Sequence, residues 1–242
     1  MRVLLSLVLW QLAALGCGQT DASRARWQIG ASGSVDACYR TLVSDAGDET
    51  RQMLIDFHED HERIRPGWTV SLDVIRELGE HWRLASGLQL SDKGYLFSIE
   101  TVFIATDGVD PEIGTSVKIN ERYHYRYLSV PLVARYSIGR GKLRFEPGLG
   151  LSADYLLEQY KVQDLEFSDG TIRAKKIKDN ATDYRDLCAS ACLELTASIR
   201  LGESLAIRFG PRARYQMTPL ADTPIRGYLW EAGFLAGATL RL

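Results

Sequence analysis

The tetrapeptide His58-Glu59-Asp60-His61 is the densest group of potential metal-binding side chains in the sequence. If the segment were helical, the two histidines and the carboxylates between them could bind a divalent metal ion. No nearby residues supply the additional ligands or the base of the known zinc motifs. Because charged residues are also expected in a solvated loop, we predict no metal site and no cofactor here.

The same histidines and His124 are the candidates for acid–base chemistry. A hydrolytic triad needs a histidine that is hydrogen-bonded to a serine and oriented by a carboxylate. No spacing of Ser, His and Asp in the sequence identifies such a triad, so we assign no catalytic residue. An enzyme remains the alternative hypothesis. It requires His58, His61 or His124 to meet a serine or a carboxylate at hydrogen-bond distance above a barrel-side cleft.

The elements that position these residues show hydrophobic alternation with a period of two. Within residues 186–201, every second residue from Leu187 to Leu201 is apolar, and the other face carries polar, charged and cysteine side chains. Alternation over about fifteen residues predicts a β-strand, and a membrane-crossing strand that projects past the bilayer explains its length. Helical periodicity is suggested only around residues 49–64.

The same alternation predicts seven further strands, at residues 26–38, 67–78, 81–91, 123–138, 142–157, 204–217 and 228–242. Short turns and long polar connections alternate between the eight strands. The turns are 79–80, 139–141 and 202–203, and the connections are 39–66, 92–122, 158–184 and 218–227. This arrangement predicts an all-β fold, an eight-stranded antiparallel up-and-down transmembrane β-barrel with short periplasmic turns and long outer loops.

Aromatic residues support the membrane interpretation, because tryptophan and tyrosine collect at the two membrane interfaces. One expected girdle, near the inner ends of the strands, contains Trp27, Trp82, Tyr136 and Phe145. The other, near the outer ends, contains Trp68, Tyr155, Tyr215 and Trp230.

The polar face of each strand must then point into the barrel. The acids on this face are Asp36, Asp73, Glu77, Glu146, Asp154, Glu194 and Glu231. The bases are Arg83, Arg135, Arg144, Arg200, Arg208, Arg212, Arg214 and Arg241. An eight-stranded barrel is about wide enough for side chains to fill, and buried charges are costly unless paired. We therefore predict an internal ion-pair network rather than a pore, with an anionic solute on Arg208, Arg212 and Arg214 as the alternative.

The N-terminal segment differs from the rest of the chain. After Arg2, residues 3–15 form an apolar run that is typical of a secretory signal peptide and too short for a transmembrane helix. We expect cleavage after Gly18, which leaves a signal peptide of residues 1–18 and a barrel domain of residues 19–242. A lipoprotein is the alternative, because the four residues that end at Cys17 loosely resemble a lipobox.

Three cysteines remain after such cleavage: Cys38, Cys188 and Cys192. Cys188 and Cys192 lie about 13 Å apart along one strand, too far for a disulfide, which needs Cα atoms within roughly 7 Å. A bond between Cys38 and Cys188 requires both to lie above the barrel rim. Free thiols in a polar interior are the other interpretation.

Residues 127–136, Tyr-Leu-Ser-Val-Pro-Leu-Val-Ala-Arg-Tyr, resemble the PorT-like outer-membrane β-barrel domain family, whose fourth strand carries a Tyr-Leu-x-Ile/Val-Pro-Leu signature. Residues 145–150 (Phe-Glu-Pro-Gly-Leu-Gly) resemble that family's fifth strand, and residues 90–94 its third-strand exit. Residues 237–242 resemble the insertion signal that the outer-membrane assembly machinery reads, although they end in leucine. The resemblance implies an outer-membrane barrel; the family's one named role, assisting protein secretion, does not follow from fold alone.

Composition narrows the functional classes further. A net charge of −2 lacks the basic excess that nucleic-acid binding requires. We therefore predict a non-enzymatic outer-membrane protein of a Gram-negative envelope with a structural, partner-binding or secretion-associated role; the alternative is a hydrolase or lipid-modifying enzyme at the barrel rim. The expected partners are outer-membrane lipid and lipopolysaccharide, the assembly machinery, and an envelope or secretion protein.

Overall fold

The computed structural model describes residues 27–44, 49–100, 116–139, 141–167, 171–178 and 184–242. The expected signal peptide and Cys17 lie outside these residues. The described residues form ten strands and one helix: β1 (Trp27–Ser44), α2 (Glu49–His61), β2 (Glu62–Glu77), β3 (Trp82–Lys93), β4 (Tyr95–Glu100), β5 (Ser116–Tyr136), β6 (Leu143–Phe167), β7 (Ile172–Ile177), β8 (Leu187–Arg200), β9 (Leu205–Gln216) and β10 (Ile225–Arg241).

Eight of the strands pair in an antiparallel ring, so that each has two long neighbours. The order is β1-β2-β3-β5-β6-β8-β9-β10, and β10 pairs again with β1. The two short strands extend one end of this ring, where β4 pairs with β2 and β5, and β7 pairs with β6. The all-β antiparallel up-and-down architecture is thus confirmed, with ten strands in the sheet rather than eight.

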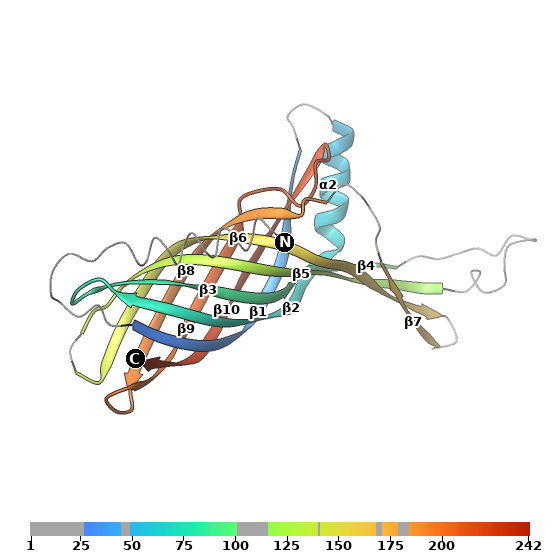
Figure 1. The fold of residues 1–242 in the computed structure, drawn as a ribbon. Helices are drawn as coiled ribbons and strands as arrows, with labels where there is room; N and C mark the ends of the chain where they lie inside the picture. Colours follow the sequence, from blue (N-terminus) through green and yellow to red (C-terminus); the bar gives the residue numbers. More distant parts are fainter. Residues whose placement is uncertain (1–26, 45–48, 101–115, 140, 168–170, 179–183) are drawn as a thin grey trace, which may run out of the picture.

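Figure 1 shows the tilted strands side by side, with the C-terminus at one end and α2 and β7 at the other. The three predicted turns lie at the end that holds the C-terminus, between β2 and β3, β5 and β6, and β8 and β9. Gly79 (φ +136°) and Gly139 (φ +104°) supply the left-handed backbone that the first two turns contain. We name this the turn end, and the opposite end the outer end.

The predicted strand bounds are wrong mainly at the outer end, where the ladders continue further. Residues 92–122, predicted as a loop, contain β4 and the first part of β5, and residues 158–184 contain β7 and the end of β6. Residues 39–66 contain the end of β1, α2 and the start of β2. Hydrophobic alternation fades where both faces of a strand meet polar surroundings, yet the backbone hydrogen bonds persist.

The apolar side chains of the ring point outward, and the polar ones point inward. On β8, Leu193 is 47% exposed, whereas its neighbours Cys192 and Glu194 are 6% and 5% exposed. On β6, Leu151 is 58% exposed and Asp154 is 1% exposed. Such a contiguous apolar exterior is rare on a soluble monomer and matches a surface that contacts lipid.

The expected aromatic girdles lie on this exterior. At the turn end, Trp82 and Tyr136 pack edge to face with ring centroids 5.1 Å apart. Nearer the outer end, Trp230 is register partner to both Tyr215 and Tyr39, and the Tyr39 ring lies 5.7 Å from it. These two bands enclose the apolar exterior. No helix in the described part of the chain has the length and apolar character of a membrane-spanning helix.

Candidate functional sites inside the ring and at its outer end

The interior contains a network of ion pairs to which all eight ring strands contribute. Arg212 lies 2.6 Å from Glu231, Arg208 lies 3.0 Å from Asp73, and Arg135 lies 2.9 Å from Glu194. Arg214 lies 3.4 Å from Glu231 and 3.7 Å from Asp154. All of these side chains are buried. The three arginines suggested as an anion site, Arg208, Arg212 and Arg214, therefore already have carboxylate partners, which a solute anion would have to displace.

Lys93 is an interior cation that the sequence interpretation missed. It is 2% exposed, and its Nζ lies 3.5 Å from Glu231, 3.9 Å from Asp154 and 5.4 Å from the centre of the Tyr127 ring. Residue 93 was placed in a predicted loop. A signal was present, because Lys93 continues the inward parity of Arg83 and the odd-numbered residues that follow it on β3.

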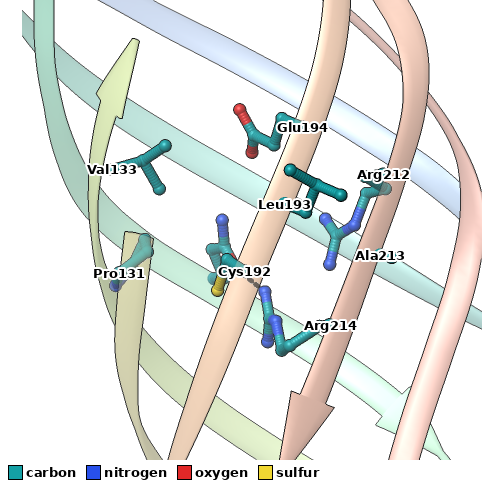
Figure 2. Close-up of a pocket in the computed structure, with 9 residues that line it drawn as sticks. Pro131, Val133, Cys192, Leu193, Glu194, Arg212, Ala213 and Arg214 are labelled. Carbon is teal, nitrogen blue, oxygen red and sulfur yellow. Dashed lines mark hydrogen bonds between the residues drawn. The ribbon is translucent and has the colours of Figure 1, made fainter. Parts of the chain in front are cut away.

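Side chains fill the middle of the interior. Figure 2 shows the gap among β5, β8 and β9, where Glu194, Arg212 and Arg214 lie opposite Pro131 and Val133. Its free volume is about 10 Å³, which is close to the space that one water molecule needs. Side chains therefore occupy nearly all of the space at this level of the interior.

Tyrosines close the outer end of the interior. Tyr95, Tyr125 and Tyr127 are each at most 3% exposed, and they form one apolar cluster with Cys188, Leu220 and Leu229. Tyr95 stacks on Tyr123 with centroids 4.6 Å apart. Residues 123, 125 and 127 share the inward face of β5, so their alternate spacing was the available sequence signal. We name these six buried side chains with Tyr123 and Tyr184 the tyrosine cap.

The cap continues onto the segment between β9 and β10. Leu220 accepts a backbone hydrogen bond from Arg185 at 2.8 Å and donates one to Gly227 at 2.8 Å, which folds residues 217–224 over the opening. Arg40 lies over the Tyr95 ring at 4.0 Å and also pairs with Glu62. Aromatic packing and a paired cation therefore seal this end.

His124 satisfies part of the requirement for a rim enzyme. Its Nδ1 lies 3.1 Å from Asp92 and 2.6 Å from Arg65, and its ring stacks on Tyr160 with centroids 4.5 Å apart. Arg126 also approaches Asp92, at 3.4 Å. Among the described residues, no serine or cysteine side chain is hydrogen-bonded to His124. The rim-enzyme alternative is not favoured.

The helical expectation for residues 49–64 is confirmed by α2, which ends at His61. His58 lies 3.1 Å from Glu62, and the His61 ring nitrogen lies 2.7 Å from the Phe57 carbonyl oxygen. Both histidine rings pack near Phe97, at 5.5 and 6.0 Å. In the part of the chain that the structure describes, no three His, Cys, Asp or Glu side chains are arranged as ligands for a metal.

The three cysteines are free thiols buried inside the ring. Cys188 and Cys192 share the inward face of β8, and Cys38 lies on β1 beside Arg65 in the register. The sequence left open either a disulfide between Cys38 and Cys188 or free thiols, and in the structure these thiols are free.

Comparison with known proteins places this geometry among membrane barrels. A family model described as outer membrane protein beta-barrel domain matches residues 18–223. A search of curated proteins found no match. Neisserial surface protein A is 10% identical over 86% of this chain and 95% of its own, with a TM-score of 0.38. Ail, the attachment invasion locus protein of Yersinia pestis, is 12% identical over 89% and 98%, with a TM-score of 0.35. Outer membrane protease OmpT from Escherichia coli is 10% identical over 93% and 99%, with a TM-score of 0.39. Such low identities transfer no function.

Proposed function

Because the chain belongs to the outer membrane protein beta-barrel domain family, we propose that it is a non-enzymatic envelope protein that acts through its outer end. The protein is an outer-membrane β-barrel, and this location associates it with lipid and lipopolysaccharide. Residues 1–18 would direct export and be cleaved, and the assembly machinery would insert residues 19–242.

The closed interior is the observation that carries this proposal. Paired charges fill the middle, and the tyrosine cap covers the outer opening. A barrel filled in this way is suited to structure and display rather than to conduction. The parts that extend beyond the outer girdle, which are α2, β4, β7 and the outer halves of β5 and β6, are the surfaces available to a partner.

Bilayer conductance and complementation of a deletion strain test the proposal together. In planar bilayers, we expect the purified protein to give no stable conductance steps. A variant lacking residues 217–224 should give none either, because it keeps the ion-pair network in the middle of the barrel. A deletion strain should show a secretion or envelope defect that the intact gene repairs and that a gene lacking α2 repairs poorly. Steady ion conduction by the intact protein, or full repair without α2, would overturn it.

We further infer that the chain belongs to the PorT-like group within its family and supports protein secretion. The Tyr-Leu-Ser-Val-Pro-Leu motif supports this inference, because it lies on β5 next to the Phe-Glu-Pro-Gly-Leu-Gly segment of β6. A secretion assay on the deletion strain separates this role from a purely structural one, which would alter envelope integrity but leave secreted proteins unchanged.

A further inference from the structure

We propose that the turn end of the interior binds a phosphate-class oxyanion between Arg144 and Arg200. This site lies at the opposite end from the surfaces of the proposed function and goes beyond that function. Its failure would leave the outer-end role intact.

Arg144 and Arg200 lie on neighbouring strands and face the same way. Arg144 is register partner to Ser198 on β8, two residues before Arg200, and the Arg200 backbone N–H donates to the Lys142 carbonyl at 2.8 Å. Residues in this diagonal relation on one face of an antiparallel pair lie about 7–8 Å apart at Cα, within reach of long side chains. Both arginines share the inward parity of Glu146 and Glu194, and both are half-buried. The two arginines therefore project from the same inward face at the turn end, within reach of each other.

Among the described residues, these two arginines differ from the other inward-facing arginines because they have no carboxylate as an ion-pair partner. At the same end, Arg83 pairs with Glu146, and Arg241 lies 2.9 Å from Glu77. Among the described residues, no carboxylate oxygen lies within the 4.0 Å ion-pair distance of Arg144 or Arg200. The Nε of Arg144 is buried and has no hydrogen-bond partner. An unmet buried donor is costly, so an external acceptor would be stabilised here.

Like charges lie around the unmatched pair. Arg200 and Arg83 are the arginines with which Arg144 has unfavourable Coulomb interactions. Arg200 experiences the same repulsion from Arg241 and Arg83. Glu77 and Glu146 offset part of this repulsion from beyond the ion-pair distance. An anion between the two guanidinium groups would offset the rest.

The local charge selects the class of anion. Among the inward-facing side chains described at this end, Arg83, Arg144, Arg200 and Arg241 carry four positive charges and Glu77 and Glu146 carry two negative charges, which leaves an excess of two positive charges inside the ring. The next pair inward, Arg208 with Asp73, cancels itself. A phosphate monoester carries a charge of about −1.5 to −2 at neutral pH. Its oxygens also match the planar fork of a guanidinium. A carboxylate would leave half of the excess unmatched.

Calorimetric titration of the full protein in zwitterionic detergent tests the site, with inorganic phosphate as the probe at low ionic strength. We expect saturable binding that is stronger than the binding of acetate. Replacing either arginine, in Arg144→Gln or Arg200→Gln, should weaken phosphate binding about tenfold or more, because a charged hydrogen bond is lost. The matched control is Arg122→Gln, which removes an arginine that already pairs with Asp164 at the outer end and should leave the affinity unchanged.

Heat-modifiable electrophoretic mobility establishes that each variant is folded before it is titrated. A second titration with short-chain phosphatidic acid identifies the source: binding that competes with free phosphate indicates a lipid headgroup, whereas binding of free phosphate alone indicates a soluble phosphate. Both results support the site. Equal affinity for acetate and phosphate, no phosphate binding, or unchanged binding by the folded double variant would overturn it.

Discussion

Arg212 and Glu231 form an ion pair 2.6 Å long in the middle of the ring, and both side chains are buried. The two residues lie on adjacent strands, β9 and β10. Glu231 also forms ion pairs with Arg214 at 3.4 Å and with Lys93 at 3.5 Å. One buried carboxylate therefore contacts three cations, which Asp154 and Asp36 also help to neutralise. The stability of the interior depends on this residue more than on any surface charge, because removing one member of a buried pair leaves the others uncompensated.

Glu231→Gln keeps the shape of the side chain but removes its charge. We expect the free energy of unfolding to fall by about 3–5 kcal/mol, measured by urea titration in detergent micelles. The control is Asp164→Asn, which breaks the more exposed pair with Arg122 and should cost less than about 1 kcal/mol. Equal effects of the two substitutions would contradict a structural role for the buried network.

Gly94 lies where β3 passes into β4, and its backbone has a φ of +154°. A Cβ atom at this position would lie 1.8 Å from the Tyr123 carbonyl oxygen, so Gly94→Ala must displace the backbone beneath the tyrosine cap. We expect a loss of about 2–4 kcal/mol in the free energy of unfolding. Gly202→Ala, in the turn between β8 and β9 where a Cβ meets no atom within 4 Å, should change stability little. A wild-type unfolding midpoint for Gly94→Ala would argue against this close approach.

The exterior of β6 is expected to contact hydrocarbon, whereas β7 lies beyond it. Leu151→Arg should therefore destabilise the protein by about 2–4 kcal/mol in lipid vesicles. Ile172→Arg, at a site that is 65% exposed on β7, should be nearly neutral. Unfolding titrations in vesicles measure both. Similar costs at the two positions would place the membrane boundary elsewhere.

Tyr123, in the tyrosine cap, should make the outer end sensitive to alkaline pH. Burial raises its pKa, and so do the neighbouring Tyr95 and the hydrogen bond that Tyr123 donates to Glu121 at 2.6 Å. The folded pKa lies above the unfolded value of about 10, so the stabilisation is complete below pH 10 and is lost as the pH rises through the folded pKa.

Absorbance of tyrosinate against pH should show a group that ionises later than free tyrosine, and Tyr123→Phe should remove it. The thermal midpoint of the wild type should fall above pH 10 more steeply than that of Tyr123→Phe. If the two proteins respond identically, Tyr123 does not control the alkaline transition.

The membrane-crossing parts of the strands were predictable because lipid and a polar interior impose opposite demands on neighbouring residues. Leu193 and Glu194 show this contrast at its clearest. The outer part of β5 was not predictable by the same rule, since Glu121 and Arg122 are both charged although one points inward and the other outward. Where neither face of a strand is apolar, the alternation of side chains between the two faces produces no alternation in hydropathy along the sequence.

The candidate sites were harder to predict because they depend on partners across strands. Parity placed Arg144 and Arg208 on the same inward face, yet it could not show that only Arg208 meets a carboxylate, Asp73. That difference depends on the register of strands far apart in the chain. Likewise, the approach of Asp92 to His124 needs β3 and β5 to be aligned.

The pairing of β1 with β10 has a consequence for the kinetics of folding. Gln28 pairs with Arg241, and Ser44 pairs with Ile225, so this ladder joins the two most distant parts of the ring sequence. Every other ladder of the ring joins strands that follow each other closely in the chain. Contacts between residues so far apart in the sequence form slowly, because the chain loses the entropy of loop closure before the hydrogen bonds compensate for it. We therefore expect hairpins to form first and the β1–β10 seam last, which makes the edges of these two strands the exposed surface that a chaperone must shield during assembly.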